Sequence, residues 1–542
     1  MEGSSKKIKI TIVTDDGKTN MRSEEKTGQN ITVTHDSSMT LMSTLLKNGL
    51  VLGSFCGGRG DCGRCRVQFI RGVMIPTMLE RSVMTAEELR QGYRLACLTR
   101  PRDDCVIRLS FAEEKKIAII SEMKEMSEFD DQLSQQNEQS VNQTTCVSDT
   151  CVIEKKASVT EKDVETVIAV DLGTTTIAMQ LMEIGTGRIL DTYCAMNPQR
   201  CYGSDVISRI KASGEGKRKE LQQMVLFVLK EGVMQFRRRG ISIQCMCIAG
   251  NTTMVHLLMG YDVLSLGRHP FTPVEIGLQV YEDPDWDFKA WISPGINAFV
   301  GGDIVAGLYA LGMLFNIDPI RHDDRCEELD KGMEDIAAQN ARLLIDLGTN
   351  GEMAITDGKR MIVTATAAGP AFEGGADAGI VGSDMIAKVA ELLQTGVLDE
   401  TGLLEEPWFS EGISVGEPAV RLYNKDIRAL QVAKAAVRAG VEILWKRMGQ
   451  PPIDRVYLAG GFGYYLDVEA AFRIGLLPAS MRGKVTAAGN TSLAGAYRIG
   501  CDLLNGKTDK VQLEKRLSFI ESINLAEQEE FNALYVRYID LR

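Results

Sequence analysis

The sequence has no apolar run that approaches the ~20 residues of a membrane-spanning helix. Its first residues, Met1 to Lys7, lead into strand-like alternation and lack the apolar segment of a secretory signal. We therefore expect a protein that does not cross a membrane and that works in the cytoplasm. At 542 residues the chain is too long for one hydrophobic core and should form several domains.

Positive charge and histidine are both in short supply. The net charge of −12 leaves no basic face for phosphate backbones, which argues against nucleic acid as the main partner. The four histidines are His35, His256, His269 and His322, and no two of them have the spacing of metal ligands. We therefore do not expect a histidine metal site.

Cysteine is not scarce, but its pattern does not favour a disulfide framework. The thirteen cysteines are odd in number and scattered through a long chain without a secretion signal, which is typical of the reducing cytoplasm. Four of them form a pattern of their own. Cys56, Cys62 and Cys65 share one glycine-rich loop, and Cys97 lies in a distant segment.

Three cysteines in one loop and a distant fourth are the arrangement in which plant-type ferredoxins bind a 2Fe–2S cluster. The usual loop spacing is Cys-x4-Cys-x2-Cys, and here the first gap is one residue longer. Zinc is the alternative, but zinc ribbons usually pair two Cys-x2-Cys motifs and this chain offers one. We interpret Cys56, Cys62, Cys65 and Cys97 as ligands of a 2Fe–2S cluster.

Residues 1–110 have the order of elements expected for a β-grasp ferredoxin domain. Alternation and helical spacing predict strand, strand, helix, strand and strand at 7–13, 30–34, 39–50, 66–69 and 105–109. From 111 to 165 the composition changes to Gln, Ser, Asn, Glu, Thr and Lys with few aromatic residues. We expect a flexible polar linker there.

Beyond the linker the chain repeats itself, which predicts an internally duplicated strand-hairpin-helix unit. A buried strand that ends in Asp-Leu-Gly-Thr occurs twice, with its aspartate at Asp171 and at Asp346. Each copy continues into a returning strand and later into a strand that ends in Ala-Gly, at Gly250 and Gly460. We expect a first lobe, an acidic insert, a second lobe and a C-terminal strand and helix at 166–318, 319–340, 341–510 and 511–542.

The repeated turns have the chemistry of a triphosphate site. Glycine and threonine at a tight bend offer backbone N–H and hydroxyl donors to phosphate oxygens. The aspartate at the preceding strand end, Asp171 or Asp346, can hold Mg²⁺ through water or orient an attacking water. The alternative is that these aspartates only make Asx turns. The candidate phosphate-binding residues are Gly173, Thr174, Thr175, Gly348, Thr349 and Asn350.

Two further segments are candidates for the same site. Gly460, Gly461 and Gly463 follow a strand directly, so their backbone can approach a base or ribose closely; a glycine turn that only packs against a helix is the alternative. Asp303 precedes an apolar run. It is either the N-cap of a helix or a further carboxylate for Mg²⁺ or water.

With these motifs the chain resembles a known family. The two phosphate loops and the later Gly-Gly-x-Gly are similar to the ATPases of the acetate kinase, sugar kinase, Hsc70 and actin superfamily. Their joining to an N-terminal 2Fe–2S domain resembles the reductive activators of corrinoid enzymes. Other matching runs are 197–199, 202–210, 250–254, 301–303, 367–374 and 426–428. Relatives with a C-terminal pair of 4Fe–4S clusters are excluded, because the last 200 residues contain only Cys501.

The resemblance implies an α/β and α+β multidomain protein, in which a ferredoxin domain is joined to a ribonuclease-H-like two-lobed ATPase. The implied cofactors are a 2Fe–2S cluster, ATP and Mg²⁺, with Asp171, Asp303 and Asp346 in catalytic roles. The implied activity is ATP-dependent reduction of cob(II)amide in a methyl-transfer protein to cob(I)amide.

The implied partners are that corrinoid protein and an external low-potential electron donor. A second copy of the chain, in a homodimer, is a further candidate partner. Alternatives are an ATP-gated iron–sulfur redox sensor and an ATP-driven electron injector for another low-potential enzyme.

Overall fold

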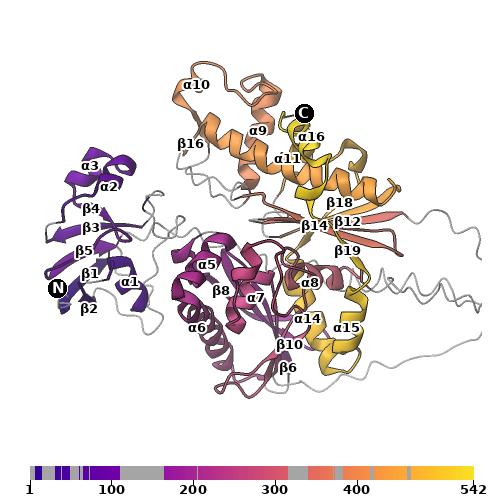
Figure 1. Ribbon diagram of the computed structural model, residues 1–542, viewed down its shortest axis with the longest axis horizontal. Helices are drawn as coiled ribbons and strands as arrows, with labels where there is room; N and C mark the ends of the chain where they lie inside the picture. The colour runs from indigo at the N-terminus through magenta and orange to yellow at the C-terminus, as the bar shows by residue number, and fades with distance from the viewer. Residues whose placement is uncertain are drawn as a thin grey trace, which may run out of the picture.

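The structure is a computed structural model in which three sheets are central (Figure 1). It describes residues 7–14, 31–37, 39–48, 60, 65–72, 74–109, 164–203, 205–314, 340–348, 350–369, 372, 382–415, 420–460 and 466–541. The expected linker and acidic insert therefore lie almost wholly outside the described residues.

The N-terminal sheet has the β-grasp order β2-β1-β5-β3-β4, in which β1 runs parallel to β5 and antiparallel to β2. Apolar residues at alternate positions of β1 and β5 pack with Leu45 and Leu95 into one core. The elements are β1 (Lys7–Thr14), β2 (Ile31–Asp36), α1 (Leu41–Lys47), β3 (Arg66–Arg71), α2 (Met78–Val83), α3 (Ala86–Arg90), β4 (Tyr93–Leu95) and β5 (Cys105–Leu109). All five elements expected from the sequence are present, and α2, α3 and β4 are additional.

The other two sheets are built alike, which confirms the duplication. Their orders are β10-β11-β9-β6-β7-β8 and β18-β17-β12-β13-β14-β19, so that β6 corresponds to β12 and β9 to β17. The first contains β6 (Glu165–Leu172), β7 (Thr176–Glu183), β8 (Ile189–Met196), β9 (Ser242–Gly250), β10 (Gln279–Tyr281) and β11 (Lys289–Ile292). The second contains β12 (Ala341–Leu347), β13 (Gly351–Thr356), β14 (Met361–Thr366), β17 (Ile453–Ala459), β18 (Val485–Gly489) and β19 (Ile520–Ser522).

Helices cover both of these sheets. In the first half they are η2 (Pro198–Tyr202), α5 (Val206–Ala212), η3 (Ser213–Lys217), α6 (Arg218–Arg237), α7 (Thr252–Met259), η4 (Leu264–Gly267) and α8 (Gly302–Ala310). In the second half they are α9 (Gly382–Thr395), α10 (Trp408–Glu411), α11 (Asn424–Arg447), α13 (Val468–Arg473), η6 (Ala479–Met481), α14 (Thr491–Leu504), α15 (Lys510–Leu517), η7 (Leu525–Glu527) and α16 (Phe531–Arg537). A small hairpin of β15 (Ile413–Val415) and β16 (Val420–Leu422) lies apart from the sheets.

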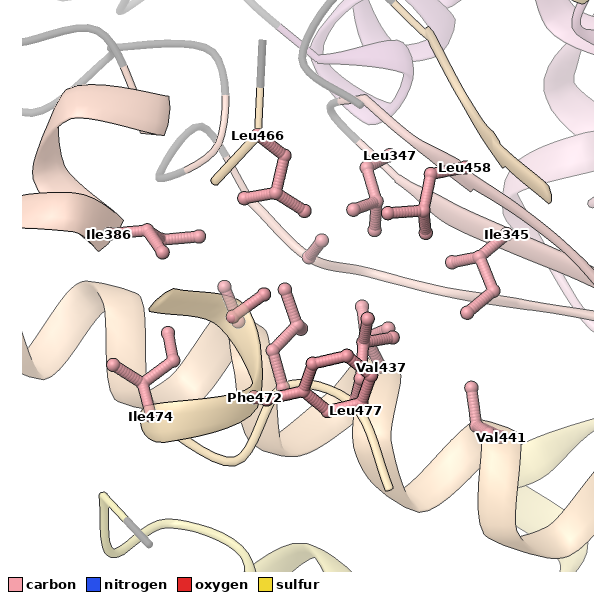
Figure 2. Close-up of a cluster of buried hydrophobic side chains, with 14 of the residues drawn as sticks. Ile345, Leu347, Ile386, Val437, Val441, Leu458, Leu466, Phe472, Ile474 and Leu477 are labelled. Carbon is pink, nitrogen blue, oxygen red and sulfur yellow. The ribbon is translucent and has the colours of Figure 1, made fainter. Parts of the chain in front are cut away.

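One face of the second sheet packs on helices of its own half. Figure 2 shows Ile345 and Leu458 of the sheet facing Val437 of α11 and Phe472 of α13 across a closed apolar layer. The opposite face belongs to a core that both halves share, since Val167 and Leu344 are buried in the same cluster as α8 and α14. α8 and α14 therefore lie between the two sheets and join the lobes.

Among the described residues no helix has the length and apolar character needed to cross a membrane.

Candidate functional site

Two cysteines that are far apart in the sequence face each other in the N-terminal domain. Cys65 directly precedes β3 and Cys97 follows β4, and the Ala96 N–H donates to the Cys65 carbonyl at 2.8 Å. Both side chains are buried. A hydrogen bond from the Cys97 thiol lowers the pKa of Cys65. The other two predicted ligands, Cys56 and Cys62, lie outside the described residues.

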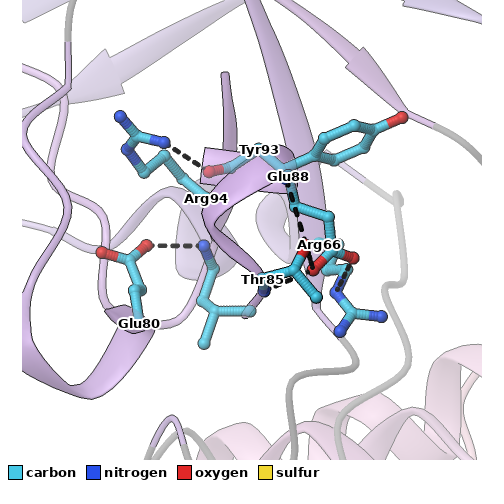
Figure 3. A network of polar contacts seen from close by, with 7 residues as sticks. Arg66, Glu80, Thr85, Glu88, Tyr93 and Arg94 are labelled. Atoms are coloured by element: carbon cyan, nitrogen blue, oxygen red, sulfur yellow. Dashed lines mark hydrogen bonds and ion pairs between the residues drawn. The ribbon is translucent and has the colours of Figure 1, made fainter. Parts of the chain in front are cut away.

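A buried carboxylate holds the segment that carries Cys97. Glu80 is 1% exposed, and its Oε1 accepts a hydrogen bond from the Leu95 N–H at 2.8 Å. Its Oε2 closes a capping box with Thr77 at the start of α2. Figure 3 shows the hydrogen bond that Glu80 accepts from the Leu95 N–H, beside the second capping box, of Thr85 and Glu88. Glu80 therefore fixes the backbone two residues before Cys97.

The pKa of its thiol distinguishes Cys65 from Cys105, another buried cysteine of the same domain. A metal-bound cysteine must be a thiolate, so a lowered pKa favours ligation. Burial raises the pKa of Cys105, in the same domain, to about 11. The lowered pKa of Cys65 thus fits the expected cluster, whereas Cys105 is a buried thiol with a raised pKa.

The first repeated aspartate stands at the end of β6 and is held by the opposite half of the chain. Asn490 Nδ2 donates to Asp171 Oδ2 at 2.9 Å, and Ser492 Oγ donates to Asp171 Oδ1 at 3.1 Å. Burial raises the pKa of Asp171, and these two hydrogen bonds oppose the rise. Asp171 thus reaches across to the start of α14.

The backbone of the first phosphate loop is fixed by side chains from a neighbouring segment. Asn197 Nδ2 donates to the Gly173 carbonyl at 2.9 Å, and Arg209 Nη2 donates to the Thr174 carbonyl. Asn251 Nδ2 donates to Thr174 Oγ1 at 2.9 Å. These hydrogen bonds restrain the backbone and the Thr174 hydroxyl of the loop. The runs at 197–199 and 202–210 therefore support the loop.

The second repeated aspartate, Asp346, ends β12 and pairs across the hairpin with Glu352. Gly460 approaches it closely and has φ +85°; a Cβ there would lie 2.6 Å from Asp346 Oδ1. A side chain at 460 would therefore collide with the carboxylate. Gly348 and Asn350 form the turn through an N–H to carbonyl bond of 2.9 Å. Thr349, Gly461 and Gly463 lie outside the described residues.

Asp303 lies in the first turn of α8 but is not its N-cap. Gly301 holds that position without a side-chain hydrogen bond, and Asp303 Oδ1 accepts instead from the Ile304 N–H at 2.9 Å. The N-cap interpretation is therefore wrong, because the helix begins two residues earlier than the apolar run suggests.

Four carboxyl groups from both halves influence one another. Burial, together with the charge of Asp171, raises the pKa of Asp303 to about 7. Burial and the charges of Asp303 and Asp171 raise the pKa of Asp346 to about 8. Burial and the charges of Asp303 and Asp346 also raise the pKa of Glu352 well above its ordinary value. Asp171, Asp303, Asp346 and Glu352 are called the acidic cluster below.

The acidic cluster suits a cation held through water. Within the described ranges no three histidine, cysteine or carboxylate side chains are close enough to share one metal ion directly. Mg²⁺ usually keeps several waters and takes few direct protein ligands. Carboxylates that lie close together can bind the water shell of such an ion.

Three family models match most of the chain. The model of the RACo middle region matches residues 166–315, and the model of the C-terminal ASKHA domain of RACo matches 340–378 and 375–542. The model of the 2Fe–2S iron–sulfur cluster binding domain matches 24–102. The chain belongs to the RACo family of reductive activators. Its N-terminal part is a 2Fe–2S domain and its C-terminal part an ASKHA domain.

Characterised relatives agree with this assignment. The RACo-family chain is 27% identical over 431 residues to the corrinoid activation enzyme RamQ of Eubacterium limosum, covering 66% of this chain and 69% of RamQ. It is 23% identical over 422 residues to the Co(II) methylated amine-specific corrinoid protein reductase of Methanosarcina barkeri, covering 68% and 76%. A solved structure titled reductive activator for corrinoid,iron-sulfur protein has the same fold, with a TM-score of 0.58, 23% identity and 98% of each chain covered.

Sequence reasoning missed Asn490 and Ser492 of this RACo-family site. A signal was present, since Gly489-Asn490-Thr491-Ser492 nearly repeats Gly250-Asn251-Thr252-Thr253. In both copies the asparagine caps a helix with its oxygen. Asn490 donates its amide to Asp171 of β6, and Asn251 donates its amide to Thr174 of the first loop.

Proposed function

We propose that this chain reduces the cobalt of a corrinoid protein by one electron, from cob(II)amide to cob(I)amide, with hydrolysis of ATP. The observation that carries the proposal is the acidic cluster, in which carboxylates from both halves meet beside two phosphate-type loops in a chain with a 2Fe–2S domain. A 2Fe–2S centre supplies single electrons at a low potential, about −400 mV in plant-type ferredoxins.

The residues of the cleft have distinct tasks in this proposal. The backbone N–H groups and hydroxyls of 173–175 and 348–350 bind phosphate oxygens. Asp171 and Asp346 would hold the water shell of Mg²⁺, and Asp303 would orient the attacking water. The adenosine lies beside the backbone of Gly460, whose missing side chain leaves room for the Asp346 carboxylate. Since these groups come from two lobes, full coordination requires the lobes to close.

Coupling to ATP has a physical reason. The resemblance implies a cobalt couple more negative than the cluster, and each ~60 mV of deficit for one electron is about 1.4 kcal/mol. Closure of the lobes around ATP can offset that deficit if it changes the corrinoid partner's conformation. The further partners that we propose are an external low-potential donor and, in a homodimer, a second chain. The site of action that we propose is the cytoplasm.

The test uses a purified corrinoid methyl-transfer protein, a low-potential chemical donor and absorbance of the cobalt centre, with and without ATP. Cys62→Ser should keep partner-stimulated ATP hydrolysis and lose reduction. Asp171→Ala should keep a reducible cluster at nearly unchanged potential and also lose reduction. Asp357→Ala, in the β13–β14 turn away from the cluster, is the matched control for an aspartate.

If Asp171→Ala reduces the corrinoid protein as fast and as fully as the parent, ATP is not coupled to electron delivery. That result would favour the redox sensor over the reductase. Zinc in place of iron in aerobic and anaerobic preparations alike would contradict the electron carrier itself.

A further inference from the structure

One short segment of the first lobe touches both the phosphate loop and the ferredoxin domain. This segment is η2 with its flanking residues, 197–203. Its first residue, Asn197, is fully buried and binds two carbonyls of the loop, Gly173 through its side chain and Thr175 through its backbone N–H at 2.8 Å. Hydrogen bonds thus fix the end of the segment that lies next to the 173–175 loop.

The other end of the segment joins the core of the ferredoxin domain. Cys201 is 6% exposed and belongs to the buried apolar cluster that also contains Cys65 and Cys97. Tyr202 of η2 and Met224 of α6 pack against the same cluster. Figure 1 shows α5 and α6 on the side of the first lobe that faces the ferredoxin domain. Cys201, Tyr202 and Met224 are called the dock below.

Buried polar contacts tie the two ends together. Gln199 is fully buried; its Nε2 donates to the Leu221 carbonyl of α6 at 2.8 Å, and its Oε1 accepts from Arg209 Nη1 at 3.3 Å. Arg209 in turn holds the Thr174 carbonyl. The Tyr202 hydroxyl is hydrogen-bonded to Glu220 of α6. A buried network of this kind resists gradual deformation, so a shift of the loop must move η2 and α6 as well.

We infer, resting on the proposed function, that η2 couples nucleotide binding at the 173–175 loop to the seating of the ferredoxin domain on the dock. Such coupling is reciprocal by thermodynamic linkage. A nucleotide that changes the seating of the ferredoxin domain must have its own affinity changed, by the same factor, when the dock is removed. The domain that carries the electron therefore senses the state of the nucleotide cleft.

The test compares two sets of variants of the full-length, cluster-loaded protein. Tyr202→Ala combined with Met224→Ala removes most of the dock and leaves Asn197, Gln199 and Arg209 in place. Phe227→Ala is the matched control, because Phe227 lies on α6 as Met224 does, is 59% exposed and is not in the dock. The probe is a non-hydrolysable ATP analogue with Mg²⁺, and its Kd is measured by titration calorimetry.

The dock variant should change the Kd by about fivefold or more in either direction, the lower range of measured allosteric couplings, and Phe227→Ala should not. Hydrogen exchange of the parent should also change at 93–99 when the analogue binds. If neither the Kd nor this exchange changes, the coupling does not exist. Should the dock variant fail to fold, the exchange of the parent alone decides.

The outcomes separate this coupling from the function on which it rests. A parent protein without measurable affinity for the analogue would contradict the proposed function and the coupling together. A parent that binds the analogue, with an affinity that does not respond to the dock, would contradict the coupling alone.

Discussion

The ionisation of individual carboxyl groups sets the charge of the cleft before a nucleotide binds. Asp303 and Asp346 are held in a water-poor site among other acids, which raises the pKa of each to about 7 and about 8. An ionised carboxylate in such a place is costly unless a cation or a hydrogen-bond donor compensates it. Asp171 has two donors from α14. We therefore expect Mg²⁺ to compensate the negative charge of the other members of the acidic cluster, Asp303, Asp346 and Glu352.

We expect the nucleotide-free protein in EDTA to lose thermal stability as the pH rises from about 4 to about 8. In that range the folded state keeps protons on Asp303 and Asp346 that the unfolded chain has released near its ordinary carboxyl pKa. Because the unfolded state binds fewer protons, the free energy of unfolding falls as pH rises, and it levels off above the folded pKa values.

Asp346→Asn should flatten this slope and raise Tm at pH 8 relative to the parent. Asp357→Asn is the control, because Asp357 lies at the β13–β14 turn and accepts from the N–H groups of Lys359 and Arg360. Calorimetry at several pH values provides the measurement. An unchanged slope in Asp346→Asn would mean that the carboxyl is ionised in the folded state throughout.

The two buried cysteines of the ferredoxin core should behave oppositely. Cys97→Ser should remove the visible absorbance of the cluster and most of the iron, because a ligand is lost. Cys105→Ser should keep both, since burial holds the pKa of Cys105 at about 11 and its thiol takes no part in ligation. Iron analysis and absorption spectra of the two variants, prepared anaerobically, provide the comparison. Equal iron in both would exclude Cys97 as a ligand.

At the scale of elements, the sequence predicted what local patterns encode. The strands that carry Asp171 and Asp346 were predicted, because about ten consecutive residues are enough to indicate a buried strand and the glycine turn after it. They lie at equivalent places in two sheets. The crossing of α14 onto the first sheet, where it contacts β6 and β9, was not expected. It depends on packing between segments more than 200 residues apart, which no local pattern records. The same crossing brings Asn490 and Ser492 to Asp171, and so these residues were missed.

The contact between α8 and α14 should tolerate no added methyl group at its closest point. A Cβ on Gly495 would overlap the backbone carbonyl of Ala306, and backbone cannot rotate away. Gly495→Ala should therefore lower the free energy of unfolding by about 3 kcal/mol, even though alanine favours helix.

Gly500→Ala on the same helix is the control. Its Cβ would lie 3.0 Å from a methyl group of Val167, which can shift slightly. Its change in stability should stay within about 1 kcal/mol. Denaturant unfolding followed by circular dichroism distinguishes the two. Equal effects would show that α8 and α14 are not in such close contact.

At the scale of the whole molecule, one core belongs to both lobes. Val167 and Cys247 of the first sheet are buried with Leu344 and Tyr457 of the second, around α8 and α14. The ferredoxin domain has its own core, and the dock of the first lobe packs against that core. The lobes can therefore close on a nucleotide while their shared apolar core stays buried. The ferredoxin domain can change its position on the first lobe without unfolding either lobe.

Thermal unfolding of the full chain should accordingly show two transitions, one for the ferredoxin domain and one for both lobes together. The first is followed by loss of the visible absorbance of the cluster and the second by calorimetry. A non-hydrolysable ATP analogue with Mg²⁺ at about 100 times its Kd should stabilise the lobes by about 2.7 kcal/mol and move the second transition upward. Asp171→Ala should abolish that shift and leave the first transition in place. Separate transitions for the two lobes would contradict the shared core, because helices that are buried against both sheets cannot leave one sheet folded while the other unfolds.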